Sequence, residues 1–250
     1  MLKFMGKCST FIFILYSTSI NAQTFGFGCL GFVGGFGGYS YQKYHADGLN
    51  SYIADFNNVN KDSLQAPMSS FGAAAGYRVG INFFRANFPG FILTSKGFYQ
   101  SLVESKDAQI ISTMGSSNYK VRLNTWGFGF DVGASITGAV SWKVIDAALL
   151  FNKATFTNTK NRPGSFTDIK EYKSDSKLGY SIGTGFILEL IDEYISIEGL
   201  AAYTVFSIDE LQLNDGTKLT VTEGSSKIMN NFIDSGGFNA VIQLNVGFPL

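Results

Sequence analysis

The last segment of the chain, residues 238–250, alternates between apolar and polar positions. Its even positions are all apolar: Phe238, Ala240, Ile242, Leu244, Val246, Phe248 and Leu250. Its odd positions are mostly polar or small, with Val241 and Pro249 as exceptions. A repeat of two residues predicts an extended strand with one apolar and one polar face. Such a strand fits a soluble sandwich or a membrane β-barrel, in which every strand must alternate along its whole length.

Seven further segments show the same alternation. They cover about residues 25–41, 70–86, 91–112, 119–134, 140–157, 177–191 and 194–208. The segment 119–134 changes phase, because Val121 and Leu123 occupy odd positions whereas Trp126 and Phe128 occupy even ones. If all four apolar side chains face outward, the shift near residues 124–125 indicates a β-bulge or a strand that leaves the membrane.

The connections between these strands sort into two kinds. The short ones lie near 87–90, 135–139 and 192–193, and the long ones are 42–69, 158–176 and 209–237, with 113–118 as a shorter member of the long set. The segment 209–237 has turn sequences that allow an extra hairpin. Bacterial outer-membrane barrels alternate tight turns with longer outer loops and have an even number of strands. The fold predicted is all-β: an antiparallel up-and-down transmembrane β-barrel of eight strands.

The first long connection contains a pattern with helical spacing. Its apolar positions are Leu49, Tyr52, Ile53 and Phe56, with Val59 as a further candidate. Asp47 stands where an N-cap would be. We expect a short amphipathic helix in the first outer loop. Its apolar face either covers the barrel mouth or is a docking face for another protein.

Composition favours a membrane barrel over a soluble one. Charged residues make up 15% of the 250 residues, against about 25% in typical soluble domains. Yet no internal segment approaches the roughly 18 consecutive apolar residues of a membrane helix. Low charge without such a run is typical of barrel strands, whose apolar residues are interleaved with polar ones.

Residues 1–22 have the features of a cleaved signal peptide. Lys3 and Lys7 precede an apolar core, FIFILY, and a small residue, Ala22, ends the segment. The alternative is a membrane anchor, for which the apolar run is short. We therefore expect a signal peptide over 1–22, a barrel domain over 23–250, export to the bacterial outer membrane, and membrane lipid as a partner. Without the signal peptide the chain has two more acidic than basic residues, so we expect no nucleic-acid partner.

Together these features resemble a known family. A signal peptide, eight alternating strands and a terminal strand that ends IQLNVGFPL are similar to the small OmpA/OmpX-type outer-membrane barrels. The richness in glycine (29 residues) and aromatics is closer to the barrel proteins of Bacteroidetes. The resemblance covers about residues 24–250 and is one of pattern. We expect no periplasmic peptidoglycan-binding domain after the barrel, and therefore no cell-wall tethering role like that of full-length OmpA-like proteins.

Charged residues are expected on the inner side of the strands. The lumen of an eight-stranded barrel is narrow enough for side chains to fill, and buried charges must be paired or hydrated. We predict an ion-pair network that plugs the lumen, formed by Arg78, Lys96, Asp131, Asp146, Glu189 and Glu198. Glu104 and Arg122 are also expected on the lumen side. The alternative is a narrow gated channel lined by the same charges.

Catalytic chemistry has little support. The single histidine, His45, lies in a predicted loop near Ser40 and Ser51, and no spacing marks a catalytic pair. No cluster has metal-ligand spacing, and no cofactor is expected. We predict that the protein is not an enzyme. Three functions stay open: a structural or interaction barrel whose outer loops contact a protein partner, an OmpW-like channel for small or hydrophobic solutes, and a lipid-modifying enzyme.

Overall fold

The computed structural model describes residues 34–88, 90–111, 115–161, 164, 167–191 and 194–247. The predicted signal peptide, the first part of the first predicted strand and Phe248 lie outside the described residues.

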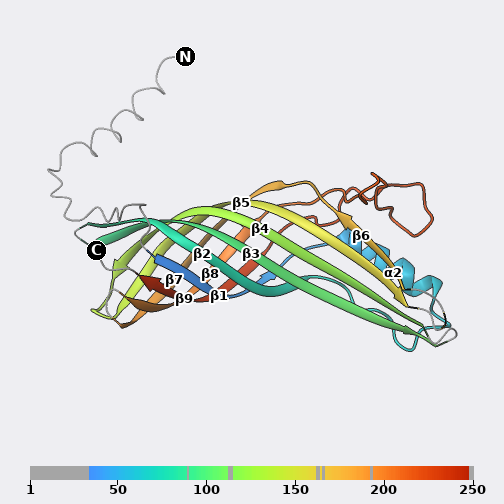
Figure 1. The fold of residues 1–250 in the computed structure, drawn as a ribbon, viewed down its shortest axis with the longest axis horizontal. Coiled ribbons are helices and arrows are strands. Elements are labelled where there is room, and N and C mark those ends of the chain that lie inside the picture. Colours follow the sequence, from blue (N-terminus) through green and yellow to red (C-terminus); the bar gives the residue numbers. More distant parts are fainter. Residues whose placement is uncertain are drawn as a thin grey trace, which may run out of the picture.

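Eight antiparallel strands form a closed barrel (Figure 1). The strands are β1 (Gly34–Lys43), β2 (Ala73–Phe88), β3 (Phe91–Ile110), β4 (Gly115–Ser135), β5 (Val140–Asn161), β7 (Lys177–Ile191), β8 (Ile195–Val205) and β9 (Phe238–Gly247). Each pairs with its neighbour in this order, and β9 closes the ring by pairing with β1. The predicted eight-stranded antiparallel barrel is confirmed.

The two ends of the barrel differ. Gly34 pairs with Gly247, so both described ends of the chain lie at one end, together with the short β2–β3, β4–β5 and β7–β8 connections. The opposite end carries helix α2 (Asp47–Val59), strand β6 (Asp168–Lys173) and the segment 206–237 (Figure 1). We call the first end the turn end and the second the loop end.

Three neighbouring strands are much longer than the others. Strands β3, β4 and β5 have 20, 21 and 22 residues, whereas β1 and β9 have 10 each. A strand needs about 9–11 residues to cross a bilayer. The loop-end halves of β3–β5 therefore extend beyond the rest of the barrel and form a curved wall, against which α2 lies (Figure 1).

The apolar and polar faces of the barrel wall exchange places between its two halves. Along the outer face of β4, the polar residues Asn118, Lys120, Arg122 and Asn124 precede the exposed apolar residues Trp126, Phe128 and Phe130. Along its inner face, Tyr119, Val121 and Leu123 are buried, and Thr125, Gly127, Gly129 and Asp131 follow. Strand β5 changes in the same way at the paired positions: Phe151 pairs with Trp126, and Lys153, on its loop-end side, pairs with Asn124.

This exchange corrects the predicted side of three residues. Val121 and Leu123 were expected outward but are 0% and 4% exposed on the inner face, whereas Arg122 is exposed on the outer face. The pairing of β4 with both neighbours runs without a shift past residues 124–125, so the predicted bulge is absent there. The second interpretation, a strand that leaves the membrane, fits β4 instead, because the strand continues without a break on the loop-end side of the exposed apolar residues Trp126, Phe128 and Phe130.

The second long connection is also more ordered than predicted. Strand β5 continues to Asn161, and β6 pairs with it over residues 168–173, within the segment expected to be a loop. The sequence of β6, DIKEYK, is too polar to be recognised as a strand. In the third long connection, isolated bridges join Gln212 to Lys218 and Thr220 to Ile228, as the possible hairpin suggested.

Helix α2 turns its apolar face into the protein. Leu49, Tyr52, Ile53 and Phe56 are all buried, and Val59, at 74% exposed, is not part of this face. The predicted Asp47 N-cap is wrong: the N-cap is Ala46, and the Asp47 N–H is instead donated to Asp234 from the segment after β8. Among the described residues, no helix is long and apolar enough to cross a membrane.

Two asparagines fasten α2 to the segment before β2. The Asn50 side chain donates to the Phe71 carbonyl and accepts from the Phe71 N–H, at 3.0 and 2.7 Å. Asn57, two turns further along, makes the same pair of bonds with the backbone of Met68, at 2.9 and 2.8 Å. Both amides thereby satisfy backbone groups of an irregular segment that would otherwise lack partners.

A hydrophobic core fills the space between α2 and the wall. Tyr119 of β4 and Phe156 of β5 are completely buried, with ring centroids 5.6 Å apart, and Phe232 lies 5.7 Å from Phe156. Tyr52 of α2 contacts both wall aromatics, and burial raises the pKa of its hydroxyl to about 12. The loop end is thus a packed structure with its own core.

Substitution of Leu49 by alanine should destabilise this core selectively. Leu49 is 0% exposed, and removal of a buried leucine side chain costs about 2–5 kcal/mol. We expect faster hydrogen exchange in α2 and faster proteolysis of residues 44–72, with exchange of the β9 amides unchanged. Val59→Ala, on the exposed side of the same helix, is the matched control and should change the free energy by less than about 0.5 kcal/mol. Equal effects of the two variants would contradict the assigned core.

Candidate functional site

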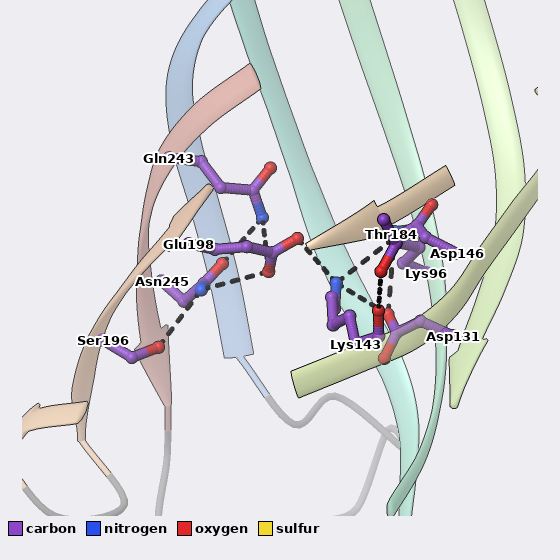
Figure 2. A network of polar contacts seen from close by, with 9 residues as sticks. All are labelled: Lys96, Asp131, Lys143, Asp146, Thr184, Ser196, Glu198, Gln243 and Asn245. Atoms are coloured by element: carbon purple, nitrogen blue, oxygen red, sulfur yellow. Dashed lines mark hydrogen bonds and ion pairs between the residues drawn. The ribbon is translucent and has the colours of Figure 1, made fainter. Parts of the chain in front are cut away.

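Five charged side chains meet inside the turn-end half of the barrel (Figure 2). Lys96 comes from β3, Asp131 from β4, Lys143 and Asp146 from β5, and Glu198 from β8. Each is at most 4% exposed. We call these five residues the lumen network.

The two lysines bridge the three carboxylates. Lys143 Nζ lies 2.6 Å from Glu198 Oε1, 3.0 Å from Asp131 Oδ2 and 3.3 Å from Asp146 Oδ2. Lys96 Nζ contacts Asp146 and lies 3.6 Å from Asp131 Oδ2. Lys143 is therefore the central cation, and it connects β5 to β8 across the lumen.

A β-bulge places Lys143 in the network. Gly133 of β4 pairs with Lys143 and Val132 pairs with Ile145, which leaves Val144 as an extra residue in β5. Val144 and Ile145 both face outward, at 37% and 43% exposed. Because the bulge absorbs one residue, Lys143 and Asp146 both point inward although one number is odd and the other even. A strict alternation along β5 places odd positions such as Leu149 and Phe151 outward, and it could not find Lys143. The only signal in the sequence is Trp142, an aromatic residue at an even position, which does not fit that alternation.

Polar side chains of β8 and β9 satisfy the far side of Glu198 (Figure 2). Glu198 Oε2 accepts hydrogen bonds from Gln243 Nε2 at 3.3 Å and from Asn245 Nδ2 at 3.5 Å. Asn245 also donates to Ser196 Oγ at 3.1 Å. A buried ion pair is tolerated only when its remaining lone pairs find partners, and Glu198 has them on both sides.

Arg78, a predicted member, is buried nearby without joining an ion pair of the described residues. Its guanidinium carbon lies 3.6 Å from the centroid of the Phe98 ring and 5.8 Å from that of Phe36. Its Nε has no hydrogen-bond partner among the described residues. The charge of Arg78 still interacts with the network carboxylates at longer range. Three buried cations and three buried carboxylates therefore balance.

Glu189, the other predicted member that lies apart, is at the turn end. Its side chain is half-buried and lines a cavity of about 80 Å³, which also reaches Arg85, Asp131 and Lys143. Its position in β7 follows the inward parity expected from the sequence. However, it lies on the turn-end side of the network, and none of the ion pairs among the described residues involves it.

A second cavity lies on the loop-end side of the network. It has a volume of about 20 Å³ and is lined by residues that include Arg78, Phe98, Gln100 and Asn152. It shares no lining residue with the turn-end cavity. Lys96, Asp146 and the Phe36–Arg78–Phe98 stack occupy the lumen between the two.

The candidate catalytic residues are not assembled. His45 is exposed and its backbone bridges to Ser235, whereas Ser40 is fully buried and accepts a hydrogen bond from Asn239 at 3.1 Å. Ser51 is exposed on α2. Within the described part of the chain, no three His, Cys, Asp or Glu side chains are arranged to hold a metal ion.

Glu104, predicted on the lumen side, is buried at the loop end and accepts a 2.6 Å hydrogen bond from Tyr44.

Comparisons with known proteins find likeness only among solved structures. No protein-family model and no curated protein sequence matches the chain. The attachment invasion locus protein Ail of Yersinia pestis, solved in complex with the heparin analogue sucrose octasulfate, is similar with a TM-score of 0.39 and 10% identity. A structure of Ail without that ligand gives 0.37 and 9%. Both alignments cover 86% of this chain and 97% of Ail.

Removal of the central cation should destabilise the barrel. Lys143→Met leaves Asp131 and Glu198 with less compensation in a buried site, and breaking a buried pair costs about 3–5 kcal/mol. Urea unfolding of the refolded protein in detergent measures this loss. Lys227→Met is the control and should be nearly neutral, because Lys227 is exposed and forms none of the ion pairs found among the described residues.

The same experiment can test coupling within the network. The double variant Lys143→Met with Glu198→Gln removes one positive and one negative charge, so it should be less destabilised than the sum of the two single variants. Additive losses would show that the two side chains do not interact.

Proposed function

We propose that the protein is a bacterial outer-membrane β-barrel with a structural or interaction role, whose lumen is closed by the lumen network. The observation that carries this proposal is a belt of exposed apolar side chains around the turn-end half of the barrel. Its members include Tyr39, Tyr77, Val79, Ile81, Trp126, Phe128, Phe130, Leu149, Phe151, Tyr180, Ile182, Phe186, Tyr203, Phe238, Ile242 and Leu244, all at least 37% exposed. Monomeric soluble proteins rarely expose apolar patches of this extent, whereas a barrel that spans a membrane needs an apolar outer face in contact with lipid.

Aromatic residues support the position of one membrane boundary. Tyr77, Tyr99 and Trp126 stand side by side on β2, β3 and β4, with ring centroids 6.2 and 5.1 Å apart. Immediately beyond them on the outer face of β4 come Asn124 and Arg122. Amphipathic aromatics gather where hydrocarbon meets headgroups. With the predicted signal peptide, this arrangement supports insertion with the loop end outside the cell and the turn end in the periplasm.

The closed lumen rests on the separation of the two cavities. Paired charges and the Phe36–Arg78–Phe98 stack fill the section between them, and the cavity on the loop-end side holds about one water molecule. A solute would have to break several buried ion pairs to pass. The proposal therefore assigns the lumen a stabilising role and assigns no catalytic role to any residue.

The interaction role rests on the packed loop end. The core around α2 holds the outer surface in one shape, and a rigid surface loses less entropy on binding than flexible loops do. The surface itself is polar and carries charges of both signs. A protein partner at the outer loops is consistent with such a surface.

A narrow channel is the second candidate function, favoured by the turn-end cavity that reaches Lys143 and Glu198. Single-channel recording in a planar bilayer distinguishes the two. We expect no steady conductance for the wild type, because the network fills the lumen. Arg78→Ala and Glu198→Ala should introduce brief openings, since each removes a side chain from the filled section.

Steady wild-type openings whose conductance changes in either variant would reject the closed lumen and identify those residues as pore lining. Lys227→Ala is the control for the effect of a remote charge.

A further inference from the structure

We propose that the outer face of β2–β4 binds one phosphorylated lipid of the outer leaflet, with its acyl chain in an apolar groove and its phosphate at a cluster of three cations. This inference rests on the proposed insertion in the membrane. It goes further by naming a specific lipid site on one side of the barrel, whereas a belt alone requires only a nonspecific lipid shell.

The apolar part of the site is a groove on the outside of the barrel. It runs across three neighbouring strands and is lined by Val79, Ile81 and Phe83 of β2, Gly97 and Tyr99 of β3, and Trp126 and Phe128 of β4. Gly97 contributes no side chain, and the Phe83 and Phe128 rings lie 2.7 and 3.5 Å from where its Cβ would be. The floor is thus low at the centre and bordered by aromatic rings. This shape suits a hydrocarbon chain that lies along the wall.

The polar part is a depression directly on the loop-end side of the groove. It is formed by the same three strands, a few residues nearer the loop end on each. Its polar side chains are those of Ser101, Arg122 and Asn124, and Ala75, Gly76, Tyr77, Tyr99 and Val103 complete its lining. Tyr99 lines both parts. Ser101 donates to Asn124 Oδ1 at 2.9 Å. Along the outer wall, the apolar groove is therefore followed by a small depression with polar side chains. This order matches that of a lipid molecule, in which an apolar acyl chain is followed by a polar headgroup.

One cation lines the depression, and two more lie near it on β4 and β5. Arg122 lines it, Lys120 is two residues further along the same outer face, and Lys153 of β5 pairs with Asn124 and is thus diagonal to Arg122. None of the three takes part in the ion pairs of the described residues. Arg122 beside the side-chain NH2 of Asn124 is a suitable pair of donors for phosphate.

The nearby carboxylates are already engaged. Glu171 of β6 is in register with Lys120 two strands away, since both pair with Thr157 of β5, and it lies 2.9 Å from Lys173. Asp107 of β3 accepts a hydrogen bond from Asn118 at 2.6 Å. The hydrogen bond from Asn118 leaves the negative charge of Asp107 in place, so the three cations and this one carboxylate give a net positive charge at the height where lipid headgroups lie. Charge complementarity selects an anionic lipid as the occupant.

The chain contains a built-in reporter for this site. It has two tryptophans: Trp126 lines the groove, and Trp142 is on β5 near the β4–β5 turn. In a Trp142→Phe background, Trp126 is the single tryptophan, and its fluorescence reports the lipids at and beside the groove. The test uses this variant refolded into vesicles of phosphatidylcholine that contain either brominated phosphatidylglycerol or brominated phosphatidylcholine, whose bromines quench nearby tryptophan.

We expect brominated phosphatidylglycerol to compete for the site at least about five-fold better than brominated phosphatidylcholine, as attraction by one or more cations near a headgroup would give. Arg122→Gln with Lys153→Gln should bring this ratio close to one. Lys61→Gln with Lys227→Gln removes two exposed cations far from the groove and should leave the ratio unchanged. Soluble glycerol phosphate should not abolish the preference, because it lacks the chain that fills the groove.

Other outcomes overturn the proposal. Equal quenching by both lipids would show no selective site, and a preference that survives Arg122→Gln with Lys153→Gln would place it elsewhere. Loss of the preference in the Lys61/Lys227 control would reduce it to net charge, and loss with glycerol phosphate would indicate a site for free phosphate. If neither brominated lipid quenches Trp126, the proposed membrane insertion itself fails, which is a separate result.

Discussion

A closed sheet of eight strands encloses every second side chain, and this constraint shapes both halves of the protein. The enclosed side chains must fill a narrow space, and each buried charge or polar group left without a partner costs free energy. The turn-end half meets this requirement with paired charges, centred on Lys143 between Asp131 and Glu198. The loop-end half meets it with apolar side chains, centred on Tyr119 and Phe156 around α2. The same strands carry both solutions in succession.

The two interiors differ because the surroundings of the two halves differ. Where the outer face is apolar, as at Trp126 and Phe128, polar side chains are placed on the inner face. Where the outer face is polar, as at Arg122 and Asn124, the inner face becomes apolar and packs as in a soluble domain. The exchange occurs at the same level on β4 and β5, since Asn124 pairs with Lys153 and Trp126 with Phe151. Such agreement between neighbouring strands is what a single boundary between hydrocarbon and water would impose.

The alternation along the chain was enough to predict the eight strands, because a strand shows a repeat of two residues whichever of its faces points into the barrel. It was not enough to decide which face is inside beyond the belt, and so Val121 and Leu123 were placed outward. The helical spacing of Leu49, Tyr52, Ile53 and Phe56 predicted the face of α2 that is buried. Its start could not be predicted from local capping, because the partner of the Asp47 N–H is Asp234, far along the chain.

The lumen network was predictable in its residue types more than in its membership. Parity alone selected Lys96, Asp131, Asp146 and Glu198, which the structure brings together, and also Arg78 and Glu189, which form no ion pair among the described residues. Lys143 escaped because one extra residue, Val144, reverses the parity of β5 at that point. The bulge stabilises the buried carboxylates, because it adds the third cation to the interior. Without Lys143, Lys96 and Arg78 alone would face three buried carboxylates, and Glu198 would have no cation within ion-pair distance. A local departure from regular pairing thus neutralises the interior, and the regular strands around it hold the bulge in place.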